Sequence, residues 1–131
     1  MVVELTKTDL VLLTGTDYAH FVTLHKDGSP HVSPTWVDAA EGHVLINTAQ
    51  GRVKDRNVRN DPRVAVSIMK WDDAYTWVSI TGTVVDIQTG ERAERHIDEL
   101  AHRYDGEGFT YKPGQVREIV KIRPDRIIRS D

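Results

Sequence analysis

The sequence contains no cysteine among its 131 residues. This absence excludes thiolate zinc sites, iron–sulfur clusters, a cysteine nucleophile and a disulfide framework, and it fits a reducing cytoplasm, where we expect the protein to be. Such cross-links are not needed at this length, because a domain of about this size buries roughly two-thirds of the surface that its unfolded chain exposes. We therefore expect residues 1–131 to form a single domain.

Long apolar runs and an excess of positive charge are missing as well. No apolar stretch approaches the roughly 18 residues of a membrane span, and Met1–Lys7 has no basic region followed by a long apolar one. The formal net charge of −3 argues against general nucleic-acid binding. We expect neither a membrane nor a nucleic acid among the partners of the protein.

The sequence also lacks the spacings typical of metal, hydrolase and nucleotide sites. No two of the six histidines form a metal-ligand pair; His96 and His102, for example, lie on an expected helix but do not face one partner. There is no Gly-x-Ser-x-Gly elbow, no Walker-type phosphate loop and no Gly-x-Gly-x-x-Gly after a strand. We therefore expect no metal ion and no parallel dinucleotide-binding fold.

What the sequence does contain is a repeated alternation of apolar and polar residues, which is typical of half-buried strands. The alternation and turn signals such as Asp27-Gly28 predict six strands, at 19–26, 31–38, 43–48, 63–71, 75–87 and 116–128. The last strand is expected to be interrupted at Pro124. Gly82 permits the sharp bend that a closing sheet requires.

Apolar residues at helical spacing predict a long helix and a short one, and a second short helix is expected after Gly51, which frees the backbone at the end of a strand. The long helix is expected at 89–104, and the short ones at 5–14, where Thr6 and Asp9 cap the start, and at about 52–60. Six mostly hairpin-linked strands with three helices indicate a mainly β fold, a small six-stranded antiparallel barrel with helices at its ends.

Positive charge is concentrated in one segment. Residues 52–63 carry five basic and two acidic side chains, a local charge of +3, which leaves the rest of the chain at −6. The free amides at the start of the expected helix favour an anion, and Arg52 and Lys54 add full charges there, so the segment predicts a phosphate site. On a helix, Arg52, Arg56, Arg59 and Arg63 would form one stripe, which is either a solvated face or part of an anion-binding surface.

The segment Ser33-Pro34-Thr35-Trp36 is a second candidate site. Proline cannot donate to a strand ladder, so this strand lies at a sheet edge or is locally released, and its neighbours' backbone groups are free to bind another molecule. A flat heteroaromatic ring with hydrogen-bonding edges would suit that gap. Alternatively, Trp36 belongs to the core, because Val32, Pro34 and Trp36 share a face.

The outer face of the expected strand 75–87 is a third candidate. Trp77 beside Ser79, Thr81 and Thr83 makes this face too apolar for bare surface and too polar for a core. Long exposed strands pair with another copy of the chain, and a two-fold dimer would bring two such faces together. The alternative is an isolated surface tryptophan.

The order of elements, the segments HFVTLHKDGSPHVSPTWV and INTAQGRVKDRNVRNDPRVAVSI, and the strand ending in Thr81-Gly82-Thr83 resemble the pyridoxamine-phosphate-oxidase-like split β-barrel flavoproteins. Within that family the chain looks most like the small actinobacterial reductases that use the deazaflavin coenzyme F420. The resemblance covers nearly the whole chain. Its most specific part is the pattern Gly51-Arg52-x-Lys54-x2-Asn57-x3-Asp61-Pro62-Arg63.

The resemblance implies an FMN-binding split barrel and a set of cofactor contacts. The basic segment would hold the cofactor phosphate through Arg52 and Lys54, and the backbone of the Pro34 strand would meet the ring system. Family members are homodimers with two sites at the interface, so two aromatic residues of 75–87 are expected to reach the cofactor of the other subunit. The expected cofactor contacts are Ser33, Pro34, Thr35, Trp36, Thr48, Ala49, Gln50, Arg52, Lys54, Asn57, Tyr75 and Trp77.

The resemblance further implies a reductase that transfers a hydride from coenzyme F420 to an activated double bond of a small planar substrate. The alternatives are an FMN-dependent oxidase or reductase on the same scaffold and a flavin or deazaflavin carrier without turnover. The basic stripe favours the deazaflavin, whose tail carries several glutamate carboxylates beyond the phosphate. Vitamin B6 oxidation is not expected, because the sequence ends soon after its last strand. We assign no catalytic residue.

Overall fold

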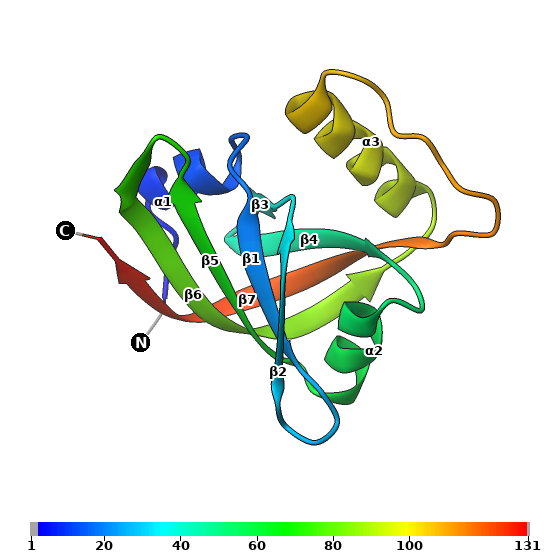
Figure 1. The fold of residues 1–131 in the computed structure, drawn as a ribbon, viewed down its shortest axis with the longest axis horizontal. Coiled ribbons are helices and arrows are strands. Elements are labelled where there is room, and N and C mark those ends of the chain that lie inside the picture. Colours follow the sequence, from blue (N-terminus) through cyan, green and yellow to red (C-terminus); the bar gives the residue numbers. More distant parts are fainter. Residues whose placement is uncertain (1–2, 131) are drawn as a thin grey trace.

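The computed structural model describes residues 3–130, which contain one antiparallel sheet of seven strands and three helices (Figure 1). The strand order is β2-β1-β5-β6-β7-β4-β3. The strands are β1 Ala19–Leu24, β2 Pro30–Thr35, β3 Asp38–Ala40, β4 His43–Ala49, β5 Arg63–Lys70, β6 Asp73–Gln88 and β7 Arg117–Arg129. The helices are α1 Lys7–Leu13, α2 Val53–Asn60 and α3 Glu91–Asp105. The predicted mainly β class and the three predicted helices are confirmed.

The number of strands differs from the six that the sequence predicts. The predicted strand 31–38 ends with β2, and Asp38–Ala40 form a separate strand at the opposite edge of the sheet. The chain crosses from one edge to the other at Trp36 and Val37, and β3 then pairs with the start of β4. Two consecutive apolar residues, Trp36 and Val37, interrupt the alternation at this crossover, but the interruption alone does not show at which edge of the sheet the chain continues.

Pro124 does not interrupt the last strand, contrary to the prediction. β7 is unbroken, and Pro124 lies opposite Gly82 at an irregularity in the register between β6 and β7. The proline is accommodated because the regular ladder is already disrupted at this point. A Cβ atom on Gly82 would lie 2.5 Å from the backbone oxygen of Arg123, so the close approach of the two strands requires glycine.

The rolled sheet encloses an apolar core, and α1 and α2 lie at opposite ends of it (Figure 1). Val66 of β5 and Ile80 of β6 are fully buried in this core. Leu13 of α1 and Val58 of α2 belong to the same cluster. None of the helices within residues 3–130 is long and apolar enough to cross a membrane.

The sheet does not close along its whole length, and the resulting split positions the site. β2 and β3 are its edge strands, which confirms the edge position predicted for the Pro34 strand. β3 pairs only with His43–Leu45, so within residues 3–130 the second half of β4 has no strand on that side. α2 follows β4 directly along the chain, and α3 covers β4 and β7, with Ala93 packed in a cluster with Leu45 and Ile119.

Candidate functional site

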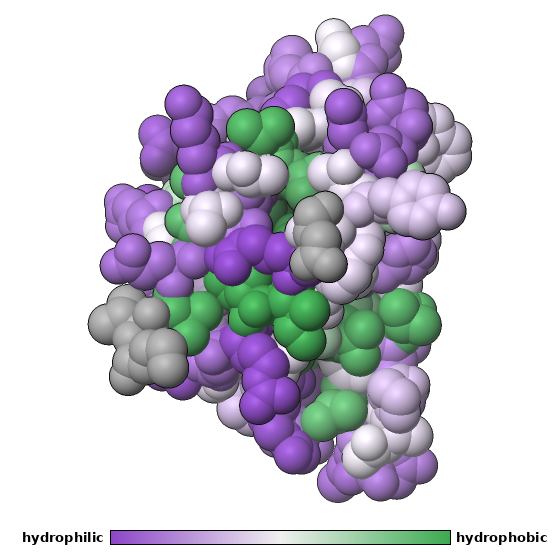
Figure 2. Space-filling view, turned by 90° about the vertical axis from the view of Figure 1, so that its left-hand side faces the viewer, coloured by the Kyte–Doolittle hydropathy of each residue, from purple (hydrophilic) through white to green (hydrophobic). Residues whose placement is uncertain are grey.

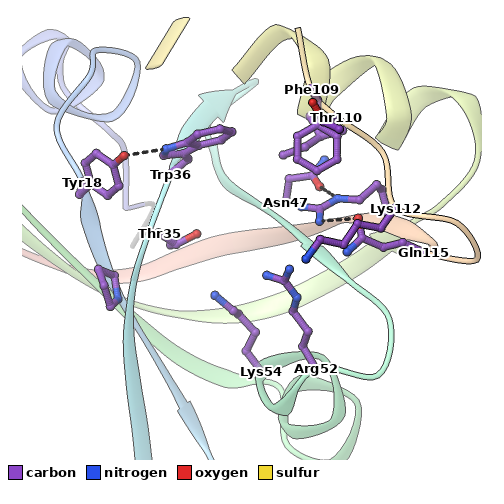
Figure 3. Close-up of a pocket in the computed structure, with 13 residues that line it drawn as sticks. Tyr18, Thr35, Trp36, Asn47, Arg52, Lys54, Phe109, Thr110, Lys112 and Gln115 are labelled. Carbon is purple, nitrogen blue, oxygen red and sulfur yellow. Dashed lines mark hydrogen bonds between the residues drawn. The ribbon is translucent and has the colours of Figure 1, made fainter. Parts of the chain in front are cut away.

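A pocket of about 380 Å³ opens at the split between β2 and β4 (Figure 3). Its walls come from β2, β4, the start of α2, α3, the loop 106–116 and the start of β7. The lining residues are Tyr18, Pro34, Thr35, Trp36, Asn47, Arg52, Lys54, Ile97, Phe109, Thr110, Lys112, Gln115 and Arg117.

The charged side chains that line the pocket are all basic. They are Arg52, Lys54, Lys112 and Arg117, and Figure 3 shows Arg52 and Lys54 reaching from α2 toward Lys112 on the opposite wall. Burial lowers the pKa of Lys54, and the charges of Arg52 and Arg117 lower it further. Burial, followed by the charge of Arg52, lowers the pKa of Arg117 to about 10. These cations repel one another, and an anion bound between them would relieve the repulsion.

The start of α2 forms the floor of the pocket as Figure 3 shows it. Arg52 is the N-cap, and no side chain caps the helix there. Gly51 has a φ of 90°, and its N–H donates to Asp55 at 2.8 Å, which fixes the loop before the helix. The first amides of α2 therefore lie without a side-chain acceptor beside Arg52 and Lys54, an arrangement typical of a phosphate site.

An aromatic wall borders the pocket on the β2 side. The Trp36 indole stacks on Tyr104, with ring centroids 5.2 Å apart and an interplanar angle of 8°, and its Nε1 donates to the Tyr18 hydroxyl at 3.1 Å. The Tyr104 hydroxyl donates to the Asp17 carbonyl at 2.8 Å and accepts from the Val37 N–H at 3.2 Å. Trp36 is half-buried and lines the pocket, so the alternative that it belongs to the core is wrong.

A chain of hydrogen bonds runs from Arg117 away from the pocket. The Nε of Arg117 donates to Oδ1 of Asn47 at 3.0 Å, and Nδ2 of Asn47 lies 3.0 Å from the Ala93 carbonyl and 3.1 Å from Nδ1 of His96. Because arginine only donates and a carbonyl only accepts, the orientation of the amide is fixed and His96 Nδ1 is the acceptor. The Nε2 of His96 then donates to Asp38 at 2.9 Å.

Two buried carboxylates lie behind the loop that precedes α2. Asp55 accepts from the Gly51 N–H and from Arg59 Nε, both at 2.8 Å, and the fully buried Glu118 accepts from Arg59 Nη2 at 2.6 Å. Burial and the adjacent Asp55 raise the pKa of Glu118 to about 7. Burial opposes ionisation of Asp55 too, but its hydrogen bonds outweigh burial and lower its pKa. Neither this cluster nor any other within residues 3–130 has the arrangement of a metal site.

The structure brings some of the predicted cofactor contacts together and leaves others aside. The predicted residues that line the pocket are Pro34, Thr35, Trp36, Arg52 and Lys54. Those that adjoin them along the chain but are not among the lining residues are Ser33, Thr48, Ala49 and Gln50. The hydroxyls of Ser33 and Thr48 are buried without a partner among the described residues. Asn57 is not among the lining residues. Its Nδ2 donates to the Thr23 hydroxyl at 3.0 Å and so links α2 to β1.

Tyr75 and Trp77 lie on β6 and do not line the pocket of their own chain. Tyr75 is 88% exposed near the turn between β5 and β6, and Trp77 is half-buried. A contact of these two residues with the cofactor of another subunit stays a prediction.

The predicted arginine stripe is not formed. α2 ends before Arg63, which lies on β5 and pairs with Asp61 at 2.8 Å. Arg59 is held by the two buried carboxylates. Of the predicted stripe, only Arg52 lines the pocket.

Sequence reasoning missed the wall formed by the loop 106–116 and the start of β7. This wall contributes Phe109, Lys112 and Arg117, which are far along the chain from Arg52. One signal was available: Arg117 and Glu118 are adjacent on an expected strand, where successive side chains face opposite sides, so one of the two charges faces the interior and needs a partner there.

A comparison with known families matches residues 6–130 to the family described as pyridoxamine 5'-phosphate oxidase. Among solved structures, an F420 reductase is 28% identical, with a TM-score of 0.79 over 89% of this chain and 93% of that one. A conserved hypothetical protein from Mycobacterium tuberculosis is 23% identical, with a TM-score of 0.73 over 99% and 86%. General Stress Protein 26 from Bacillus anthracis, 17% identical with a TM-score of 0.73 over 95% and 92%, likewise shows the fold alone. No curated protein matches the chain.

Proposed function

Because the chain belongs to the pyridoxamine 5'-phosphate oxidase family, we propose that its pocket binds a flavin-type cofactor and that this cofactor is the deazaflavin coenzyme F420. The observation that carries the proposal is the composition of the pocket, whose charged residues are all basic and which is bordered by a fixed aromatic wall. The likeness to an F420 reductase over most of both chains supports it. FMN, which has the same kind of ring and phosphate, is the alternative.

The residues of the pocket fit the parts of such a cofactor. The start of α2, with Arg52 and Lys54, would hold the phosphate. The indole of Trp36 borders the pocket and would take a flat ring, and the free edge of β2 offers backbone groups to the polar edge of that ring. The additional cations on the far wall favour a cofactor that carries more negative charge than one phosphate.

We infer that the protein is a reductase acting on a small planar substrate with an activated double bond. The bound cofactor supplies the hydride chemistry, and the protein supplies binding, orientation and electrostatics. Trp36, held by Tyr104 and Tyr18, would fix the plane in which ring and substrate lie. None of the described residues that line the pocket is acidic, so the proton comes from water or from a side chain that we do not assign. A carrier without turnover is the alternative, which an unassigned proton donor also permits.

We also infer a homodimer with a cofactor at each end of the interface. The turn between β5 and β6 exposes Trp71 at 84% and Tyr75 at 88%. Figure 2 shows apolar side chains gathered across the face that carries α1 and the ends of β6 and β7. Exposed apolar surface of this kind typically marks an interaction site. A second copy covering these side chains would bring Tyr75 and Trp77 to the pocket of its partner.

Titration of the purified protein with coenzyme F420 and with FMN, followed by fluorescence, tests the cofactor. We expect the deazaflavin to bind more tightly. Tighter binding of FMN with no affinity for the deazaflavin would contradict the proposal.

Turnover tests the reaction. Reduced cofactor is mixed with a panel of quinones, unsaturated lactones and tetrapyrroles, with and without the protein. We expect at least one acceptor to be reduced faster with the protein present. No acceleration with any acceptor would favour the carrier.

A further inference from the structure

Arg117 is a buried cation without a carboxylate partner. It is only 5% exposed, and within residues 3–130 its hydrogen bonds go to the neutral amides of Asn47, at 3.0 Å, and Gln115, at 3.3 Å. Its Cζ lies 5.0 Å from the centre of the Phe109 ring. Burying an unpaired guanidinium costs free energy, so the stability of the fold does not explain this arrangement.

The adjacent carboxylate does not neutralise Arg117. Glu118 projects from the opposite face of β7, because successive side chains of a strand alternate, and it binds Arg59 there. In the pocket itself, the charged neighbours Arg52 and Lys54 have the same sign as Arg117. Among residues 3–130, the lining of the pocket therefore supplies no counter-charge to Arg117.

The guanidinium of Arg117 is also held in a fixed direction. Asn47 accepts its Nε–H, and the Asn47 amide is itself fixed by Ala93 and His96. A planar guanidinium held in this way is suited to a carboxylate, which it can bind through two parallel hydrogen bonds. The exposed Lys112 lines the same wall and adds a second cation.

We propose that Arg117, together with Lys112, binds a carboxylate group in the pocket, apart from the phosphate site at the start of α2. This inference rests on the proposed function, because it assumes that the start of α2 binds the cofactor phosphate while Arg117 and Lys112 bind a different group. The carboxylate comes from the tail of the cofactor or from the substrate beside the ring. In both cases the pocket selects ligands with two separated negative groups.

The first arm of the test measures the cofactor as the source. Coenzyme F420, and the same deazaflavin without its glutamates but with its phosphate, are titrated into the wild type and Arg117→Gln. If the tail supplies the carboxylate, the substitution weakens binding of the complete cofactor by about tenfold or more and that of the shortened one by less than about threefold. Arg126→Gln, which changes an exposed arginine of the same strand, is the control and should alter neither.

The second arm measures a substrate-like source. Benzoate, a flat carboxylate, is titrated into the complex of each protein with the shortened deazaflavin. If the substrate supplies the carboxylate, Arg117→Gln weakens benzoate binding by about tenfold or more, and Arg126→Gln leaves it unchanged. A loss in one arm supports the inference and identifies the source. No loss in either arm would overturn it.

A second variant keeps the test independent of folding. Lys112 is exposed on a loop, so Lys112→Ala should leave the thermal unfolding midpoint unchanged and weaken binding in the same arm as Arg117→Gln. Unchanged binding by a folded Lys112→Ala and a folded Arg117→Gln would overturn this inference alone. A wild type that binds neither deazaflavin would overturn the proposed function and this inference with it.

Discussion

At the scale of residues, the ionisable side chains around the pocket fall into two groups. Lys54 and Arg117 face the pocket with no carboxylate from residues 3–130 lining it, whereas Asp55 and Glu118 lie behind it and share Arg59. The carboxylates therefore fix the backbone at the start of α2 without neutralising the pocket. This separation leaves the positive charge available to a ligand.

Lys54→Ala tests the phosphate contact. A charge-assisted hydrogen bond lost from the site weakens binding of either cofactor by about 1.5–3 kcal/mol, measured by isothermal titration calorimetry. Lys7→Ala, which removes an exposed lysine on α1, is the control. Unchanged affinity of Lys54→Ala would remove this residue from the site.

Glu118 makes stability depend on pH. Its pKa in the folded chain, about 7, is above the ordinary value of 4.5, so the folded state holds the proton more tightly than the unfolded state. The contribution to stability is complete below about pH 4.5 and is lost as the pH rises through about 7. We expect the thermal unfolding midpoint of the wild type to fall between pH 5 and pH 8, and Glu118→Gln to reduce this fall.

Thermal denaturation in a series of buffers measures the effect, with Glu99→Gln on the exposed face of α3 as the control. An equal fall in Glu118→Gln and in the wild type would show that other groups cause the pH dependence.

At the scale of elements, the helices and strands that depend on residues close together in the sequence could be predicted. α1 begins with the capping box of Thr6 and Asp9, and the basic segment at the end of β4 does lead into a helix. β3 could not be predicted, because its pairing with the start of β4 depends on a crossover of the chain between the two edges of the sheet. The continuity of β7 through Pro124 could not be predicted either, because it depends on the register with β6.

The candidate site likewise combines residues that local sequence signals identify with residues that only long-range strand pairing brings into place. Arg52, Lys54 and the Pro34 strand could be found because each stands in a short segment with a recognisable signal. Arg117 and Lys112 reach the pocket only because β7 pairs with β4, a long-range contact that sequence spacing does not encode. Five of the thirteen residues that line the pocket were therefore predicted from the sequence.

Gly82→Ala tests the approach of β6 and β7. The new Cβ would lie 2.5 Å from the Arg123 oxygen and 2.7 Å from Cγ2 of Ile122, so the strands must separate. We expect a loss of about 1–3 kcal/mol in the free energy of unfolding, measured by urea denaturation. Thr81→Ala, at an exposed neighbouring position, should cost less. Equal costs would contradict the role assigned to the glycine.

At the scale of the whole molecule, the proposed dimer explains the aromatic side chains exposed near the β5–β6 turn. We expect sedimentation equilibrium to give twice the mass of the chain. Tyr75→Asp places a charge on the proposed interface, since Tyr75 is 88% exposed in the single chain. It should shift the protein toward the monomer and weaken cofactor binding. A monomeric wild type, or a Tyr75→Asp dimer with unchanged affinity, would contradict the shared site.

The central claim is that the split between β2 and β4 holds a deazaflavin. The most direct test is to purify the protein from its native source and to measure the absorbance and mass of any chromophore bound to it. We predict a deazaflavin with a phosphate and a tail of several glutamates. A mass equal to that of FMN would contradict the claim.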